Sequence, residues 1–192
     1  MSDNDFSNIT VIIPAAGVGK RMKSYGPKPL IMVGESTVIN MQIATIKSNI
    51  NARDIILVCG FKADKLMNET PDSIVKIENE SYEDNNVIRS IGIALRATRD
   101  TDTVVIVYGD LVFNSAAIEH LNLEKSCVVI DNDHMTDDEI GCIIDKRGNL
   151  ANMMYDLPIK WGGAFECIRH KDIKIVDIDT SKDIKIAIGI LT

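Results

Sequence analysis

Residues 9–22 read ITVIIPAAGVGKRM, a run of β-branched side chains that gives way to a loop of small residues and then to two basic ones. A short, continuous run of β-branched residues predicts a strand that is buried on both faces of a sheet. Small residues in the loop let backbone N–H groups approach a ligand closely. This stretch therefore predicts a ligand-binding loop at the carboxyl end of a central strand.

Similar apolar runs at residues 55–59, 74–77 and 104–108 predict three further strands. Between them, apolar residues recur every three or four positions over residues 39–50 and 88–98, which is the spacing of amphipathic helices. Strands that alternate with helices predict an α/β fold: a Rossmann-like, open, mostly parallel (mixed) sheet with helices on both faces. Ligands of such sheets bind at the carboxyl ends of the strands.

The rest of the chain has a different pattern. Residues 126–168 contain short apolar runs separated by glycines, which predicts short strands in mixed or antiparallel pairing. A last helix is expected over residues 181–191, with Ser181 as its N-cap. A chain of 192 residues can bury one sizeable core, so we expect a single domain.

The composition argues against several classes of protein. A net charge of −7 disfavours a nucleic-acid binder, because affinity for a phosphate backbone needs a basic face. No stretch reaches the roughly 18 apolar residues of a membrane span, and residues 1–8 are largely polar and acidic, unlike a signal peptide. We therefore expect a cytoplasmic protein that binds neither nucleic acid nor membranes. The sequence makes no prediction of its oligomeric state.

The loop after the first strand does not match two familiar phosphate-binding motifs. The dinucleotide fingerprint needs a third glycine where Met22 stands, and the ATPase P-loop needs a glycine at Pro14 and a hydroxyl residue at Arg21. Lys20, Arg21 and Lys28 nevertheless place three cations near the loop in an acidic chain. A triphosphate carries about four negative charges, so its site needs such fixed cations.

Together with PKPL at residues 27–30, the segment IIPAAGVGKRM at residues 12–22 resembles the signature of the sugar-phosphate and alditol-phosphate nucleotidyltransferases. The resemblance implies the nucleotide-diphospho-sugar transferase type of fold, with a loop whose backbone wraps a nucleotide. It places Ala15, Ala16 and Gly17 next to the base and ribose. It also implies that Arg21 and Lys28 hold the phosphates.

Two acidic positions follow in the order that this resemblance predicts. Asp110 follows the strand at 104–108 just past Gly109, where the family has a metal-binding aspartate. DIDT at residues 177–180 resembles the closing DIDTPEDL segment of the family. Mg²⁺ prefers oxygen ligands and usually takes one or two carboxylates. We expect Asp110 and Asp179 to hold Mg²⁺, with Asp177 as the alternative. For either aspartate alone, a turn or helix cap is an equally good interpretation.

A further resemblance concerns the branch of the family. Residues 85–95, NNVIRSIGIAL, resemble the NNIxSLxLA helix start of phosphocholine cytidylyltransferases, and GDLVF at residues 109–113 resembles their GDVVF. CTP is therefore the favoured donor and phosphocholine the favoured acceptor. The residues expected to bind the nucleotide are Pro14, Ala15, Ala16, Gly17, Gly19, Lys20, Arg21, Asn85, Asn86 and Ser90.

The acceptor site is predicted in the later part of the chain. Tyr155, Trp161 and Glu166 could form an aromatic and acidic cage for a trimethylammonium group, although core packing is an equal interpretation of each. The whole chain is then one nucleotidyltransferase domain, with a nucleotide-binding half (1–110) and an acceptor-binding and metal-binding half (111–192). The alternatives are a sugar-1-phosphate or alditol-phosphate nucleotidyltransferase, and a catalytically silent nucleotide-binding regulatory domain.

Overall fold

The computed structural model describes residues 8–19, 26–84, 87–129, 141–154, 158–160, 166–168 and 170–191. The chain forms two compact units, one of Met1–Asn114 together with Ile175–Thr192, and one of Ser115–Lys174. The larger unit is discontinuous, because the chain leaves it after Asn114 and returns to it at Ile175.

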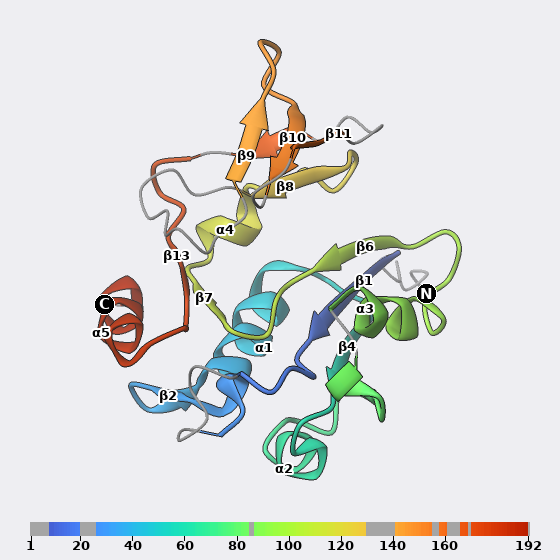
Figure 1. The fold of residues 1–192 in the computed structure, drawn as a ribbon, viewed down its shortest axis with the longest axis vertical. Helices are drawn as coiled ribbons and strands as arrows, with labels where there is room; N and C mark the ends of the chain where they lie inside the picture. The colour runs from blue at the N-terminus through green and yellow to red at the C-terminus, as the bar shows by residue number, and fades with distance from the viewer. Residues whose placement is uncertain are drawn as a thin grey trace, which may run out of the picture. The chain divides into compact units, whose positions relative to one another are not determined.

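The centre of the larger unit is a parallel sheet with the strand order β5-β4-β1-β6 (Figure 1). Its strands are β1 (Ile9–Pro14), β4 (Asp54–Cys59), β5 (Val75–Glu78) and β6 (Thr103–Ile106). Val11 of β1 lies beside Ile55 of β4 on one side and Val105 of β6 on the other. This pairing confirms the parallel sheet predicted from the apolar runs.

Helices connect these strands and help to bury both faces of the sheet. They are α1 (Val38–Asn49), the short α2 (Ala63–Asn68) and α3 (Val87–Leu95). Val11, Ile12 and Ile13 of β1 point alternately to the two faces, and all three are 0% exposed. Ala94 of α3 packs in one cluster with Ile12. Within the described ranges, no helix is both long enough and apolar enough to cross a membrane.

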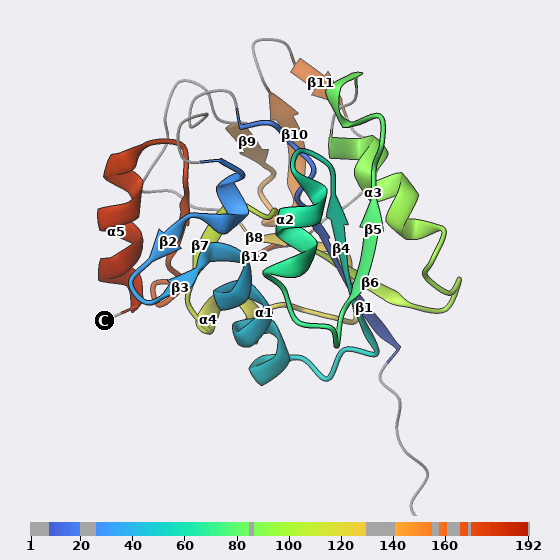
Figure 2. The ribbon, with the colours of Figure 1, turned by 90° about the horizontal axis from the view of Figure 1, so that it is seen from below.

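A second apolar cluster joins the two parts of the chain that make up the larger unit. Its residues come from the segment after η2 (Lys28–Leu30), from β2 (Met32–Val33), from the start of α1, from β7 (Leu111–Phe113) and its antiparallel partner β13 (Ile175–Asp177), and from α5 (Ser181–Leu191). Strand β2 forms a hairpin with β3 (Ser36–Thr37). Figure 2 shows β2, β7 and α5 side by side. Val33, Val112 and Ile178 are buried together there. This packing brings Asp177 and Ile178 next to Leu111 and Asp110, in the segment that follows β6.

The smaller unit is built mainly from short strands. After α4 (Ala116–Glu119), β9 (Gly141–Ile144), β10 (Leu150–Met154) and β11 (Pro158–Lys160) form an antiparallel sheet, and β8 (Cys127–Val129) pairs in parallel with β12 (Glu166–Ile168). These pairs agree with the short strands in mixed pairing that the glycine-punctuated pattern predicts.

A buried ion pair ties together the amino ends of three central strands. Arg53, which precedes β4, donates hydrogen bonds to both carboxylate oxygens of Asp102 at 2.6 Å. Thr10 Oγ1 of β1 donates to Asp102 Oδ2 at 2.8 Å, and the Asp102 side chain is 0% exposed. The bonds from Arg53 lower the pKa of Asp102 from 3.8 to about 2, although burial by itself raises it. Asp102 is therefore ionised and paired in the folded protein.

The substitution Asp102→Asn is expected to lower the melting temperature by several degrees at neutral pH, because it leaves a charged Arg53 with a weaker partner. Since folding lowers the pKa of Asp102, its contribution is present above a pH of about 4 and is lost as the pH falls through about 2. The difference in melting temperature between wild type and variant, followed by circular dichroism, is expected to narrow over that range. Asp72→Asn, at a fully exposed aspartate, is the control and is expected to change little. A pH-independent difference would contradict the prediction.

Candidate functional site

A pocket of about 310 Å³ lies at the carboxyl ends of β1 and β6, where the predicted ligand-binding loop leaves the sheet. Its walls contain the predicted site residues Pro14, Ala15, Ala16, Gly17, Gly19, Lys28, Ser90 and Asp110. They also contain Pro29, Tyr82, Val87, Tyr108 and Gly109, which were not predicted as site residues. Several separate segments thus meet at the edge of the sheet where such folds bind ligands.

Main-chain hydrogen bonds hold the loop that follows β1. The N–H of Ala15 donates to the carbonyl oxygen of Val58 in β4 (2.9 Å), and the N–H of Gly109 donates to that of Pro14 (3.2 Å). A Cβ atom at position 109 would lie only 2.8 Å from the Cβ of Ala15. Glycine at 109 therefore allows the chain after β6 to lie directly against the loop.

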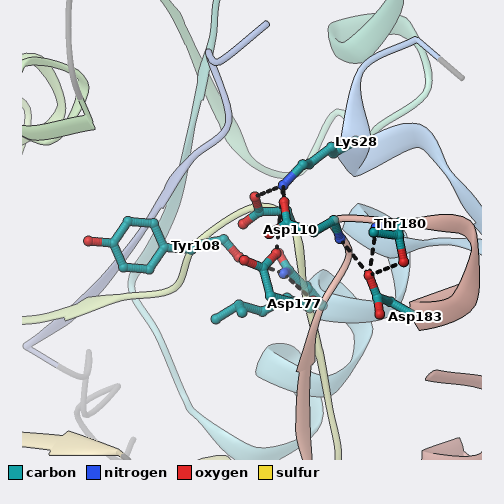
Figure 3. A network of polar contacts seen from close by, with 9 residues as sticks. Lys28, Tyr108, Asp110, Asp177, Thr180 and Asp183 are labelled. Carbon is teal, nitrogen blue, oxygen red and sulfur yellow. Dashed lines mark hydrogen bonds and ion pairs between the residues drawn. The ribbon is translucent and has the colours of Figure 1, made fainter. Parts of the chain in front are cut away.

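Three aspartates converge on one ammonium group at the edge of this pocket. Lys28 Nζ lies 2.9 Å from Asp110 Oδ2, 2.6 Å from Asp179 Oδ1 and 3.8 Å from Asp177 Oδ1. Figure 3 shows Lys28 reaching onto Asp110, with Asp177 close by. A hydrogen bond from the N–H of Ile178 to the carbonyl oxygen of Asp110 (3.0 Å) links the two acidic segments. The fold thus assembles the cluster from three segments that are far apart in the sequence.

Lys28 is the cation of this cluster, and its side chain is 13% exposed. Burial lowers its pKa, but the charge of Asp110 and the hydrogen bonds to Asp179 and Asp110 raise it by more, so the pKa of Lys28 lies above its ordinary value. The ammonium group therefore stays charged at neutral pH. Among the described residues, one positive charge faces three carboxylates, and this excess of negative charge favours a further cation.

The turn that carries Asp179 is held by Asp183. Oδ2 of Asp183 accepts hydrogen bonds from the N–H groups of Thr180 (2.6 Å) and Asp179 (3.0 Å) (Figure 3). Thr180 Oγ1 accepts one from the N–H of Lys182 (3.3 Å) and donates one to Asp183 Oδ2 (3.0 Å), so Thr180 caps the start of α5. The prediction of Ser181 as the N-cap was wrong. Thr180 takes that position because its side chain accepts a hydrogen bond from the first turn of the helix and Asp183 holds its backbone N–H.

Gln42, which holds the turn around Asp110 from helix α1, was not predicted from the sequence. Its Nε2 donates hydrogen bonds to the carbonyl oxygens of Tyr108 (2.8 Å) and Leu111 (2.6 Å), on either side of Asp110. Gln42 is 2% exposed, and the other buried residues of α1 are Val38, Ile39, Ile43 and Ile46. The signal lay in the sequence: a glutamine three residues after Ile39 interrupts an apolar helix face.

The carboxylates can be tested for their fit to Mg²⁺. In the part of the chain that the structure describes, no three His, Cys, Asp or Glu side chains are arranged to hold a metal ion by themselves. Mg²⁺ needs only one or two carboxylates and completes its shell with water and phosphate. Asp110 and Asp179 form such a pair, because both contact the same nitrogen of Lys28. The donor set therefore fits Mg²⁺ bound together with phosphate groups.

The other predicted site residues are described only in part. Ser90 is buried in α3, and its Oγ accepts a hydrogen bond from Asn79 Nδ2 (3.1 Å). Glu166 begins β12, but its side chain lies outside the described part of the chain. Wholly outside that part lie Lys20, Arg21, Asn85, Asn86, Tyr155 and Trp161. The roles of these eight residues in phosphate, nucleotide and acceptor binding stay predictions.

Comparison with known proteins matches this part of the chain to a family. The family model described as the MobA-like NTP transferase domain matches residues 11–133, which include the loop after β1 and Asp110. The chain is also 30% identical over 109 residues to the bifunctional protein GlmU of Buchnera aphidicola subsp. Schizaphis graminum, covering 56% of this chain and 23% of that protein. The aligned part thus spans about a quarter of the length of the curated relatives.

Solved structures share the fold over nearly the whole chain. The CTP:phosphocholine cytidylyltransferase from Streptococcus pneumoniae is 16% identical, with a TM-score of 0.71, and the match covers 96% of this chain and 99% of that one. The inositol-1-phosphate CTP transferase from T. maritima is 12% identical, with a TM-score of 0.75 and coverages of 97% and 96%. These similarities confirm the predicted fold class.

Proposed function

Because this chain belongs to the MobA-like NTP transferase domain family, we propose that it is a magnesium-dependent nucleotidyltransferase that couples a nucleoside triphosphate to a phosphorylated small molecule. The observation that carries the proposal is that Lys28 and Asp110 belong both to the pocket beside the glycine-containing loop and to the cluster of carboxylates. Phosphate groups in this pocket would meet a fixed cation and metal-binding oxygens at the same edge.

The proposed reaction is a direct displacement. An oxygen of the acceptor phosphate forms a bond to the α-phosphorus of the triphosphate, and the bond from that phosphorus to the pyrophosphate oxygen breaks. Pyrophosphate leaves with the electron pair of the broken bond. A phosphate monoester is largely dianionic at neutral pH, so the attacking oxygen needs no general base. Catalysis then depends on positioning and on neutralising charge.

In this proposal the loop after β1, the basic residues and the aspartates each have one of these tasks. The backbone of Ala15, Ala16 and Gly17 encloses the nucleotide, and Lys28 offsets negative charge on its phosphates. Asp110 and Asp179 would hold Mg²⁺, with Asp177 as the alternative ligand, and the bound ion supplies further neutralisation of the reacting phosphates. Arg21 and Lys20 have the same role toward phosphate in the proposal.

CTP is the proposed donor and phosphocholine the proposed acceptor. The support is the resemblance of residues 85–95 and 109–113 to phosphocholine cytidylyltransferases. Tyr155, Trp161 and Glu166 are the proposed cage, in which ring faces attract the trimethylammonium charge. The competing acceptor class is a sugar 1-phosphate or an alditol phosphate. A cytoplasmic location is part of the same proposal.

The decisive experiment measures pyrophosphate release and product mass with each of the four ribonucleoside triphosphates and Mg²⁺. The acceptors are phosphocholine, phosphoethanolamine, glycerol 3-phosphate and glucose 1-phosphate. Turnover that requires Mg²⁺, is fastest with CTP and prefers an amine-containing acceptor is expected. Turnover only with glycerol 3-phosphate or glucose 1-phosphate, which carry no positively charged head group, would overturn the phosphocholine assignment. The proposal that the protein is a nucleotidyltransferase would still hold. Nucleotide binding without turnover on a wider panel of phosphomonoesters would favour the silent regulatory domain.

The substitution Gly109→Ala is expected to raise the KM for the triphosphate about tenfold or more. The new Cβ would lie 2.8 Å from the Cβ of Ala15, so the loop that encloses the nucleotide must move. Displacements of about 1 Å can cost up to a hundredfold in activity. Steady-state kinetics with varied triphosphate tests this prediction.

Gly92→Ala provides a matched control for this change. Gly92 lies in α3, and a Cβ there would meet no atom within 4 Å. Alanine is favoured over glycine inside a helix by about 1 kcal/mol, so this variant is expected to be at least as stable as the wild type and equally active. Equal KM values for the two variants would show that the contact at Gly109 does not position the loop.

A further inference from the structure

Asp110 lies in a tight turn that is held by its main chain. The turn consists of residues 108–111, and the N–H of Leu111 donates to the carbonyl oxygen of Tyr108 (3.3 Å). The ring of Tyr108 points away from the polar network in Figure 3, so Tyr108 contributes to that network through its carbonyl group. The position of the Asp110 carboxylate therefore depends on what fixes these carbonyl groups.

Gln42 fixes two carbonyl groups of this turn from helix α1, which lies outside the turn. Its amide nitrogen donates one hydrogen bond to the carbonyl oxygen of Tyr108 and a shorter one to that of Leu111. Carbonyl oxygens only accept hydrogen bonds, so the amide nitrogen and not the amide oxygen must face them. Both donors of the side chain are thus used on the two residues that flank Gly109 and Asp110.

Packing alone does not account for a glutamine at this position. Its neighbours on the buried face of α1 are aliphatic, and its Oε1 is buried without a hydrogen-bond partner in the described part of the chain. A buried amide oxygen without a partner is unfavourable compared with an apolar side chain of the same size. What glutamine adds over such a side chain is the pair of hydrogen bonds to the turn.

From this geometry we infer that Gln42 is a positioning residue for the reaction: it locks the turn of residues 108–111 to helix α1 and so places the Asp110 carboxylate opposite Lys28 and Asp179. This inference rests on the proposed function. Gln42 acts through Asp110: it is not itself among the described residues that line the pocket, and it holds the carbonyl oxygens of Tyr108 and Leu111 from behind. Helix α1 is held in turn by its buried aliphatic face, which gives the carboxylate a rigid reference.

The test is the substitution Gln42→Met, which keeps the size of the side chain and removes both donors. The kcat is expected to fall about tenfold to a hundredfold, because a shift of about 1 Å in a catalytic group has costs of this order. The KM for the triphosphate is expected to change much less, since the loop after β1 keeps its own hydrogen bonds. Ile43→Ala is the matched control: Ile43 is buried in the same helix, so the variant is expected to melt earlier and to keep its kcat.

Two further measurements separate a positioning role from a merely structural one. In the Asp110→Asn background, Gln42→Met is expected to cause no further loss of kcat, because the carboxylate that it positions is gone. Binding of Mn²⁺ to the nucleotide-free chain, measured by calorimetry, is expected to weaken at least about fivefold in Gln42→Met and to stay unchanged in Ile43→Ala. If Gln42→Met does not fold, Gln42→Asn replaces it, because its shorter amide cannot reach both carbonyl groups.

These outcomes also distinguish this inference from the proposed function. Additive losses in the double variant, or Mn²⁺ affinity and kcat equal to those of the wild type, would overturn the role of Gln42. A wild-type chain that binds Mn²⁺ and nucleotide but turns over no substrate would overturn the proposed function alone. In that case the Mn²⁺ measurement still decides whether Gln42 positions Asp110.

Discussion

Asparagine in place of Asp110 is expected to lower kcat at least about a hundredfold while the protein folds normally. In the wild type, Lys28 donates a hydrogen bond to Asp110 Oδ2 at 2.9 Å. The amide of asparagine has the same shape and can still accept this bond, but it carries no charge to hold a metal ion. Asp179→Asn is expected to have a similar effect. Asp177→Asn is expected to be milder, because Asp177 Oδ1 lies 3.8 Å from Lys28 Nζ. The measurements are pyrophosphate release and the far-ultraviolet circular dichroism spectrum.

Asp72→Asn makes the same chemical change at a fully exposed side chain and is expected to leave kcat unchanged. A rate near the wild-type value for Asp110→Asn would contradict the proposed metal site. A larger loss of kcat in Asp177→Asn than in Asp179→Asn would support the metal site but show that Asp177, and not Asp179, is the ligand.

The substitution Lys28→Met is expected to abolish most turnover and, in the nucleotide-free protein, to tighten Mg²⁺ binding at least about tenfold. Lys28 now offsets the charge of three aspartates, two of them within hydrogen-bond distance. Methionine is about as long but carries no charge, so the carboxylates repel one another until another cation binds. A unit charge at about 4 Å is worth roughly 1 to 4 kcal/mol at effective dielectric constants of 80 to 20. The loss of Lys28 therefore raises the affinity for a competing cation.

Isothermal titration calorimetry with Mg²⁺ measures this affinity directly, and the melting temperature gives a second readout. Without Mg²⁺, Lys28→Met is expected to have a lower melting temperature than the wild type. Added Mg²⁺ is expected to raise the melting temperature of the variant by more than it raises that of the wild type. Lys65→Met, at an exposed lysine of α2, is the control and is expected to change neither quantity. Unchanged or weaker Mg²⁺ binding in Lys28→Met would show that the ammonium group and the metal ion do not share the carboxylates.

The sequence by itself determined the central sheet and the place of the pocket. The β-branched run of β1 and the amphipathic spacing of α1 and α3 are local patterns, and strands that alternate with helices permit few arrangements. Since ligands of such sheets bind at the carboxyl ends of the strands, the loop at residues 14–17 and Asp110, in the segment after β6, could be assigned to one edge in advance. Short elements were harder to predict, because six residues of α2 are too few to show a helical period.

Only the tertiary structure decided which side chains meet at that edge and how they are held. Lys28 is 82 residues from Asp110 and 151 from Asp179, and no periodicity in a sequence reports a contact over such separations. The sequence predicted Lys28 as a phosphate ligand, whereas the fold pairs its ammonium group with the carboxylates expected to hold a metal ion. In the sequence, nothing links Gln42 to Asp110. The packing of α1 beside β7 places the amide of Gln42 against the turn that contains Asp110. Local sequence patterns specify helices and strands. Which charged side chains become buried, and which group each buried hydrogen-bond donor reaches, depends on which helices and strands pack together.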